Sequence, residues 1–490
     1  MMPYAEPILN LVFQMFTKNS EGARDPLPNQ TRTLDAKSDF PDRLHNRSLM
    51  VPAERRARIL NLALPIIGGM VSQNVLNLVD TAMVGVLGVA ALAAVGMASF
   101  ANFMASAFIT GLSAGVQAIA ARRLGEGRES ETARPLNGGL LLALVLAVPL
   151  SLILIAFAGE IFGLLVDDPE VVGLGIPYFQ ARLAAMVALG VNFAFRGYWN
   201  GVNMSKVYLR TLLVMHGSNI VLNWALIFGH FGLPALGVAG AGIGSAIATF
   251  IGSALYLFQG WKLARANGFL HGLPDRTTML SMLRLSIPTG IQQFFFAAGL
   301  TAFFWILGRV GTAELAASNV LVQLLLVAIL PGLGSGMAAA SLVSQALGRR
   351  EPADAVAWGW DVAKLATFAV GLMALVGLFF PDLLLRPFLH DEQTLALARL
   401  PLRLLAATMS LDTIGMVLMN ALLGAGDNLR VMTVTLVLQW LVFLPVAYLI
   451  GPILGLGMTG VWLAHIGYRS IQAVVFLAIW RSGSWARIQV

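Results

Sequence analysis

The sequence predicts an all-α polytopic membrane protein with about twelve transmembrane helices in two six-helix lobes. Only 12% of its 490 residues are charged and 57% are hydrophobic, whereas a soluble domain carries about 25% charged residues. Apolar segments of membrane-spanning length recur along the chain after residue 50. The second half of the chain also repeats the first, a pattern typical of transporters.

The apolar segments are long enough to cross a bilayer, which takes about 20 helical residues. We expect spans at residues 60–84, 92–118, 135–158, 171–194, 208–229, 238–260, 282–307, 315–342, 357–379, 395–421, 431–450 and 458–480. The segment before them is polar, contains proline and lacks periodicity. Such a segment cannot bury enough apolar surface to fold, so we expect residues 1–50 to form a disordered cytoplasmic tail.

Basic residues mark alternate loops. Arg55, Arg56 and Arg58 precede the first span, and arginines or lysines also follow the second, fourth, sixth, eighth, tenth and last spans. The positive-inside rule therefore predicts a protein of the inner (plasma) membrane with both termini in the cytoplasm. Because the net charge of +7 is spread over short loops, we do not expect nucleic acid as a partner. The absence of cysteine excludes disulfides and thiolate metal sites.

The internal repeat defines the expected domains. Residues of the first half recur 223 positions later: the pairs are Pro65 and Pro288, Gly111 and Gly334, Leu124-Gly125 and Leu347-Gly348, and Gly201 and Gly424. Near the end the offset falls by three, pairing Leu236-Gly237 with Leu456-Gly457. We expect an N-lobe at 51–265, a cytoplasmic loop at 266–280 and a C-lobe at 281–490. Six spans per lobe keep both lobes in one orientation, so a pseudo-two-fold axis along the membrane normal should relate them across a central cleft.

One carboxylate lies within the first span. Asp80 costs roughly 2.5–3.5 kcal/mol in hydrocarbon, which makes an ion or proton site the default interpretation. Gln73 precedes it by about two helical turns and can face the same side. Asn219 and Asn223, at i and i+4 in the fifth span, offer neutral oxygen ligands. The alternative is a set of polar side chains that satisfy one another within a helix bundle. We expect no cofactor, and no metal other than Na⁺ at Asp80.

The second half places its carboxylate elsewhere. Asp80 pairs with Phe303 in the repeat, whereas Asp412, inside the tenth span, pairs with Leu189. A purely structural duplication would not need this asymmetry. Asp412 is therefore a second candidate for binding a cation or proton.

The seventh span carries a candidate substrate pathway. Gln292 and Gln293 lie beside Phe294, Phe295 and Phe296, and amides next to aromatic rings suit flat organic cations. Ordinary packing is the competing interpretation. Pro65 and Pro288 occupy equivalent places in the first and seventh spans and are candidate hinges, because proline removes a backbone donor from a helix.

A serine motif offers a remote enzymatic alternative. GLSAG at residues 111–115 matches the nucleophile elbow around Ser113, but that motif requires a strand-to-helix turn. An intramembrane serine hydrolase would also need His216 or His465, which lie in other spans. Close helix packing through small residues explains the motif better.

Several of these motifs resemble the multidrug and toxic compound extrusion (MATE) family. The resemblance covers roughly residues 58–481. The motifs are QNVLNLVDTAMVG from Gln73, AARRLGEGR at 120–128, NIVLN at 219–223, LGVAGAGIGSAIAT at 236–249 and the repeat near Pro288. The resemblance implies two lobes that open alternately to either face of the membrane. It also implies export of cationic, often aromatic compounds in exchange for Na⁺ or H⁺.

The resemblance also implies roles for single residues. Asp80 matches the first-helix carboxylate of the family, Asn219 and Asn223 its fifth-helix cation partners, and Asp412 the tenth-helix carboxylate of the NorM-like branch. That branch has a glutamate in the seventh helix where this chain has Phe296, which weakens the case for a second cation site. Arg182 in the fourth span is similar to a feature of the DinF-like branch.

The resulting prediction is a monomeric secondary antiporter and not an enzyme. Its partners are small organic cations and the lipid bilayer, and ion and drug compete through Asp80, whose charged form burial disfavours. The main alternative keeps the fold but moves a lipid-linked precursor or another metabolite. Such a protein should line its cleft with arginine or lysine for pyrophosphate. The spans are nearly free of interior cations, which favours the drug exporter.

Overall fold

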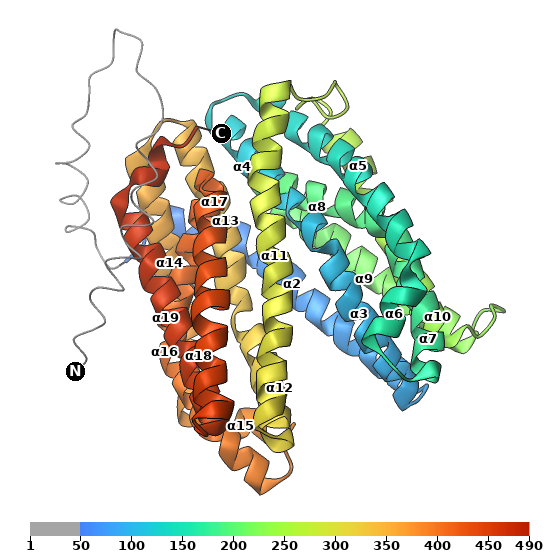
Figure 1. Cartoon of the computed structure of the whole chain (residues 1–490). Coiled ribbons are helices and arrows are strands. Elements are labelled where there is room, and N and C mark those ends of the chain that lie inside the picture. Colours follow the sequence, from blue (N-terminus) through green and yellow to red (C-terminus); the bar gives the residue numbers. More distant parts are fainter. Residues whose placement is uncertain (1–49, 490) are drawn as a thin grey trace, which may run out of the picture. The chain divides into compact units, whose positions relative to one another are not determined.

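The computed structural model describes residues 50–489, and within this range it contains helices but no strand. The predicted tail at residues 1–50 lies outside the described residues except for Met50. Eleven helices are long and apolar enough to cross a membrane, and a further pair, bent by 47°, completes a twelfth span. The prediction of about twelve transmembrane helices is therefore confirmed (Figure 1).

The first half of the chain forms six spans. In order they are α2 (Ala53–Gly85), α3 (Val89–Thr110) with α4 (Leu112–Gly125), α5 (Arg134–Ala156), α7 (Pro169–Ala184) with α8 (Met186–Gly201), α9 (Ser205–Phe228) and α10 (Gly237–Leu263). Two short helices, η3 (Glu129–Glu131) and α6 (Ala158–Leu165), lie in connections. The bend of 47° separates α7 from α8.

The second half repeats this order. Its spans are α11 (Arg276–Val310), α12 (Thr312–Ala328) with α13 (Leu330–Gly348), α14 (Pro352–Phe379), α16 (Glu392–Ala425), the segment α17 (Asn428–Leu436), η4 (Val437–Phe443), α18 (Leu444–Tyr448) and η5 (Leu449–Ile453), and α19 (Gly457–Ser482). The short α15 (Pro381–Leu385) and η6 (Ser484–Arg487) complete the described chain.

Aspartates begin several of these helices. Asp168, Asp275 and Asp391 precede α7, α11 and α16, and each carboxylate accepts a hydrogen bond from a backbone N–H of the first turn. These caps satisfy donors that have no partner within the helix. They lie in polar connections, where the sequence changes from a loop to the next helix.

The glycine repeat corresponds to close crossings between the two halves. A Cβ on Gly111 would lie 2.8 Å from the backbone nitrogen of Gly290 in α11, and a Cβ on Gly334 would lie 3.2 Å from that of Ile67 in α2. Ile67 and Gly290 are themselves 223 positions apart, so the two crossings are repeat counterparts. Each half therefore packs its second span on the first span of the other half.

A second reciprocal crossing joins α4 to α13. A Cβ on Gly125 would lie 2.1 Å from the carbonyl oxygen of Gln345, and a Cβ on Gly348 would lie 2.2 Å from that of Arg122. Gln345 is the repeat counterpart of Arg122. Helix backbones touch here because no side chain separates them. The reciprocity supports a pseudo-two-fold relation between the halves, with α4 and α13 next to its axis.

We expect Gly125→Ala to destabilise the protein through this crossing. The added methyl group would overlap a backbone oxygen that can move only if α4 and α13 separate, and overpacking of this kind costs about 1–3 kcal/mol. Thermal unfolding of the purified protein in detergent measures the effect. Gly85→Ala is the control, because a Cβ there has open space. Equal midpoints for both variants would contradict a tight crossing.

Hydrogen bonds between the halves gather at one end of the molecule. We call it the basic end, because it carries Arg55, Arg58, Arg122, Arg123 and Arg349. Arg55 bonds to Asp354 and Asp361 of α14, both at 2.6 Å, and Arg58 bonds to Gln345. The hydrogen bonds described between a residue before 266 and one after 280 lie from Gln117 and Met337 toward this end.

The change in repeat offset has a structural cause. The eleventh span contains two π-helical stretches, η4 and η5, and is longer than its counterpart in the first half, α9. The two spans begin 223 positions apart, at Ser205 and Asn428, but end 225 positions apart, at Phe228 and Ile453. The following connection shortens, because residues 229–236 of the first half correspond to residues 454–456 of the second. The predicted pairing of Gly237 with Gly457 is confirmed, since both begin a helix with a positive φ.

Candidate functional site: an ion-binding cluster in the first half

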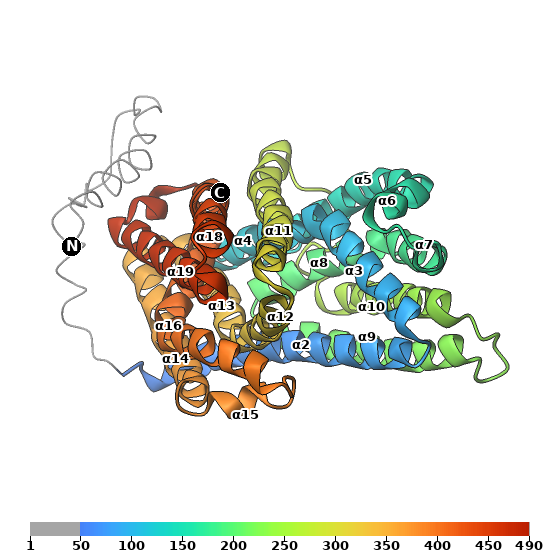
Figure 2. The ribbon, with the colours of Figure 1, turned by 60° about the horizontal axis from the view of Figure 1, so that its bottom comes forward.

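Asp80 is hydrogen-bonded to the fifth span. It lies five residues before the end of α2 at Gly85, and α2 and α9 run side by side in both views (Figures 1 and 2). Nδ2 of Asn223 donates to Oδ1 of Asp80 at 2.9 Å. The carboxylate is half-buried, and Arg182, in the last turn of α7, interacts with it electrostatically. The structure therefore brings together Asp80 and Asn223, as expected from the sequence.

Asn219 and Ser245 extend this cluster into the protein. Nδ2 of Asn223 also donates to Oδ1 of Asn219 at 2.9 Å, and Nδ2 of Asn219 donates to Oγ of Ser245 in α10 at 3.0 Å. The three side chains are buried. We call Asp80, Asn219, Asn223 and Ser245 the Asp80 cluster.

One oxygen of the Asp80 cluster has no hydrogen-bond partner. Oδ1 of Asn223 is buried and accepts no hydrogen bond from the described residues. It faces Gly244, where a Cβ would lie only 2.2 Å from this oxygen. A buried unsatisfied carbonyl oxygen costs about 1–3 kcal/mol and calls for an explanation. Rotation of the amide would exchange Oδ1 with Nδ2 and turn this oxygen toward the carboxylate.

Gln73 belongs to a neighbouring polar group rather than to the Asp80 cluster. Its Oε1 lies 3.1 Å from Nε2 of His216, and its Nε2 donates to Oδ1 of Asn77. His216 also contacts Oγ of Ser72 at 2.7 Å. This second group lies on the same α2–α9 interface, closer to the basic end. Among the described residues it shares no hydrogen bond with Asp80.

The corresponding place in the second half is aromatic. Phe303, the repeat counterpart of Asp80, lies with its ring centroid 5.8 Å from those of Phe443 and His465 and 5.3 Å from that of Trp462. His465 follows Ser245 by the smaller offset of 220. The second half thus fills with packed rings the volume that the first half fills with a carboxylate, amides and a hydroxyl.

Asp412 forms an ion pair within the second half. Nη2 of Arg469, in α19, lies 2.6 Å from Oδ1 of Asp412, and the two side chains are 22% and 16% exposed. Nη1 of Arg469 donates to Gln472. The expectation that the spans carry few interior cations is therefore wrong for the second half. The arginine can lie in a membrane-spanning helix because the carboxylate cancels its charge.

The four candidate residues of the seventh span lie in different environments. Gln292 is buried, donates weakly to Sδ of Met419 in α16, and keeps an unpaired Oε1. Phe295 packs edge-on against Trp440 of η4, and Phe296 is exposed. Gln293 is half-buried, and its side chain has no hydrogen-bond partner among the described residues.

Phe294 makes the contact between the halves in this region. Its ring stacks on that of Phe108 in α3, with 5.8 Å between centroids. The sequence shows Phe294 among the aromatic residues of the seventh span. The crossing of α3 and α11 shows that its ring faces the other half.

The remaining candidates are placed without a chemical site. Pro65 and Pro288 lie inside the continuous helices α2 and α11. The hydroxyl of Ser113 is buried and has no hydrogen-bond partner among the described residues. A Cβ on Gly197 would lie 2.4 Å from the carbonyl oxygen of Ser113. The motif thus lies at a helix crossing, as the packing interpretation expects, and the nucleophile–base hydrogen bond of a hydrolase is not formed.

The Asp80 cluster has the chemistry of a proton or monovalent-cation site. It offers a carboxylate, an uncommitted amide oxygen and a hydroxyl, which are hard oxygen ligands. Within residues 50–489, no group of three His, Cys, Asp or Glu side chains is arranged for a metal ion. Sequence reasoning missed Ser245 and Arg469. Ser245 lies in the LGVAGAGIGSAIAT motif, but nothing in its spacing indicates contact with Asn219.

Known proteins resemble the chain along most of its length. A family model described as MatE matches residues 65–225 and 288–449, one stretch in each half. The probable multidrug resistance protein NorM of Thermotoga maritima is 25% identical over 446 residues, which cover 89% of this chain and 94% of that protein. The multidrug resistance protein NorM of Aliivibrio fischeri is 25% identical, with 88% and 96% covered.

Solved structures have the same fold. One titled as a multidrug resistance MATE family transporter of the MOP superfamily, in an outward-facing conformation, superposes with a TM-score of 0.81 at 22% identity and covers 89% of this chain and 97% of that chain. At this identity the likeness supports the fold, whereas the family model matches more than half of the chain itself. The chain is a multi-pass membrane protein that belongs to the MATE family.

Proposed function

We propose that this protein is a secondary antiporter that exports cationic, aromatic compounds from the cell in exchange for Na⁺ or H⁺. The observation that carries the proposal is the Asp80 cluster, in which a half-buried carboxylate accepts a hydrogen bond from Asn223 while Oδ1 of Asn223 remains unpaired. A site with one carboxylate and one free oxygen donor can accept either a proton or a small cation. The multidrug resistance names of the relatives support the substrate class.

The proposed mechanism uses two arrangements of Asn223. When Asp80 is ionised, Nδ2 of Asn223 stabilises its charge through the hydrogen bond of 2.9 Å. When Asp80 binds Na⁺ or a proton, rotation of the amide directs Oδ1 toward the carboxylate. Neutralisation removes the charge that attracts a cationic drug, so ion and drug weaken each other's binding by the same factor. The drug then leaves outward and the ion leaves inward.

The distribution of contacts supports alternating access. The hydrogen bonds between the halves lie at the basic end, which the positive-inside rule assigns to the cytoplasm. Asp80 lies near the other end of α2. We therefore propose that the present arrangement is open to the outside, and that the units at 51–265 and 281–490 rock against each other, with Pro65 and Pro288 as hinges.

In the second half, we propose that the cation bound by Asp412 is Arg469. The pair at 2.6 Å occupies the carboxylate, and the position equivalent to Asp80 is aromatic. One coupling site, in the first half, is the consequence. This pairing also weakens the case for a lipid-linked precursor as cargo, because Arg469 is already engaged. Gln292, Gln293, Phe295 and Phe296 remain the proposed contacts for the drug.

Transport by the reconstituted protein tests the function. We expect ethidium to leave proteoliposomes when either a Na⁺ gradient or a pH gradient is imposed, and not when both are absent. The effective gradient identifies the coupling ion. Liposomes that contain the Asp80→Asn protein give the background. Failure of both gradients to drive ethidium, with the protein folded, would contradict the proposal and direct attention to other cargoes.

Gly244→Ala tests the geometry of the Asp80 cluster without changing its polar groups. The added Cβ would lie 2.2 Å from Oδ1 of Asn223, so Asn223 must move away from Asp80. Loss of the Oδ1 ligand from the ion-bound arrangement should weaken binding of the coupling ion about tenfold. The ion concentration for half-maximal transport measures this. Gly217→Ala on α9, where a Cβ has open space, is the control, and equal values for the two variants would contradict the role of Asn223.

A further inference from the structure

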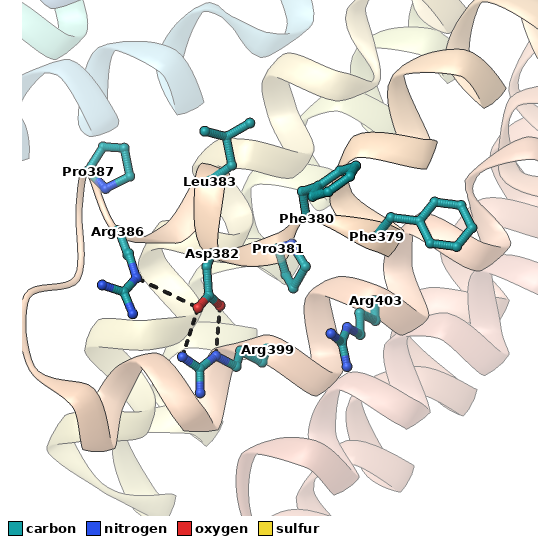
Figure 3. Close-up of a pocket in the computed structure, with 9 residues that line it drawn as sticks. All are labelled: Phe379, Phe380, Pro381, Asp382, Leu383, Arg386, Pro387, Arg399 and Arg403. Carbon is teal, nitrogen blue, oxygen red and sulfur yellow. Dashed lines mark hydrogen bonds and ion pairs between the residues drawn. The ribbon is translucent and has the colours of Figure 1, made fainter.

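A pocket lies at the end of the molecule opposite the basic end. It is a hollow of about 940 Å³ between the end of α14, α15 and the start of α16. Figure 3 shows its polar side, where Arg386, Arg399 and Arg403 surround Asp382. Phe379 and Phe380 form its apolar side. None of these residues belongs to the Asp80 cluster or to the proposed drug contacts.

The arginines are unexpected at this end. The positive-inside rule leaves the outer ends of spans poor in basic residues, yet Arg386, Arg399 and Arg403 occur within one short stretch of the chain. Carboxylates account for two of them. Arg399 binds both oxygens of Asp382, at 2.7 and 2.8 Å, and Arg386 lies 3.3 Å from Glu392. The bond from Arg399 lowers the pKa of Asp382, so this carboxylate is ionised.

Arg403 is left without a partner. Its side chain is exposed, and no carboxylate, amide or carbonyl of the described residues accepts a hydrogen bond from it. It lies one helical turn beyond Arg399 along α16, in the direction of the membrane interior. Figure 3 shows it extending beside Arg399 with no dashed contact. An arginine near hydrocarbon is costly unless it reaches an anion or the interface.

The apolar side of the pocket identifies the environment. Phe379 and Phe380 are 64% and 65% exposed, and Leu400, on the same stretch of α16, is 51% exposed. Exposed apolar rings at the end of a transmembrane helix can contact the acyl chains of neighbouring lipids. A site that combines an unpaired guanidinium, exposed rings and a hollow of this size has the features that bind a phosphate with attached acyl chains.

We propose that this pocket binds the headgroup of an anionic phospholipid from the outer leaflet, with Arg403 as the phosphate ligand. The planar guanidinium can bind two phosphate oxygens at once. Arg403 keeps an unpaired positive charge, which suits an anion and disfavours a cationic drug. The acyl chains would lie against Phe379, Phe380 and Leu400.

Lipid binding to the purified full chain tests the site. The delipidated protein in detergent is titrated with phosphatidylglycerol, and bound lipid is counted by native mass spectrometry. We expect Arg403→Gln to weaken the tightest phosphatidylglycerol site about tenfold, the effect of losing a charged hydrogen bond. Arg309→Gln is the matched control, because Arg309 is an exposed arginine at the same end that stacks on Trp305 outside the pocket.

Three results would overturn the proposal. Equal phosphatidylglycerol affinity in the Arg403→Gln and Arg309→Gln proteins would remove the pocket as the site. Displacement of the lipid by glycerol 3-phosphate at similar concentrations would indicate a soluble phosphate compound instead. Equal affinity for phosphatidylcholine would exclude selection by charge.

Arg403→Lys separates charge from geometry. The proposal requires this variant to bind more lipid than Arg403→Gln does, and a loss equal to that of Arg403→Gln counts against a phosphate ligand.

Discussion

Asp80→Asn should abolish ion-driven export while leaving the protein folded. The substitution keeps the size of the side chain but removes the ionisable group that proton, Na⁺ and drug are proposed to share. Coupling free energies between sites are about 1–3 kcal/mol, or about 5- to 150-fold in affinity, so ethidium efflux driven by the gradient should fall by about 100-fold. Asparagine can still pair with the amide of Asn223, so thermal unfolding should change little.

The control for this prediction is a carboxylate elsewhere on the protein. Asp167→Asn makes the same chemical change at an exposed position between α6 and α7, and its efflux should match that of the unmodified chain. Proteoliposomes that carry each variant, with the same imposed gradient, measure the difference. Normal gradient-driven efflux by Asp80→Asn would exclude Asp80 as the coupling group and would leave the Asp80 cluster with a structural role.

Asp412→Asn should cause the largest loss of stability. It would leave Arg469 charged and unpaired in a membrane-spanning helix, and breaking a buried ion pair from one side costs about 3–5 kcal/mol. The midpoint of thermal unfolding in detergent should fall accordingly. The double variant Asp412→Asn with Arg469→Gln removes both charges and should recover most of the loss.

The comparison of single and double variants also distinguishes two roles of Asp412. If Asp412 serves only the ion pair, the double variant should transport ethidium as the unmodified chain does. If Asp412 binds a coupling ion as well, the double variant should be stable but impaired in transport. A single Asp412→Asn variant as stable as the unmodified chain would mean that the pair contributes nothing to the fold.

The fold was predictable because it depends on repeated small residues. The offset that pairs Gly111 with Gly334 and Gly125 with Gly348 indicates two related halves, and the structure places these glycines at reciprocal crossings. Their spacing survives because a side chain at either crossing would collide with backbone. The π-helical stretches η4 and η5 were not predictable, since their residues are ordinary apolar ones and only the lengths of the two counterpart spans reveal the insertion.

The Asp80 cluster was predictable in part. Asn219 and Asn223 lie on one helix face because of their spacing. Asn223 is hydrogen-bonded to Asp80, and Asn219 is hydrogen-bonded to Asn223. Gln73 has suitable spacing but turns toward His216. Arg469 pairs with Asp412 across 57 positions of sequence. Contacts of that kind depend on how two helices pack, and periodicity within one helix carries no information about them.

The hydrogen bonds at the basic end affect how readily the two halves could separate there. Ser341, Ser344 and Gln345 donate to backbone carbonyls of the other half, and Arg55 joins the halves there through two ion pairs. When these groups separate at an aqueous surface, water replaces each partner, so the net cost is about 1 kcal/mol per bond. Apart from the ion pairs of Arg55, this closure is held by hydrogen bonds whose partners water can replace, so it should be shallow and reversible.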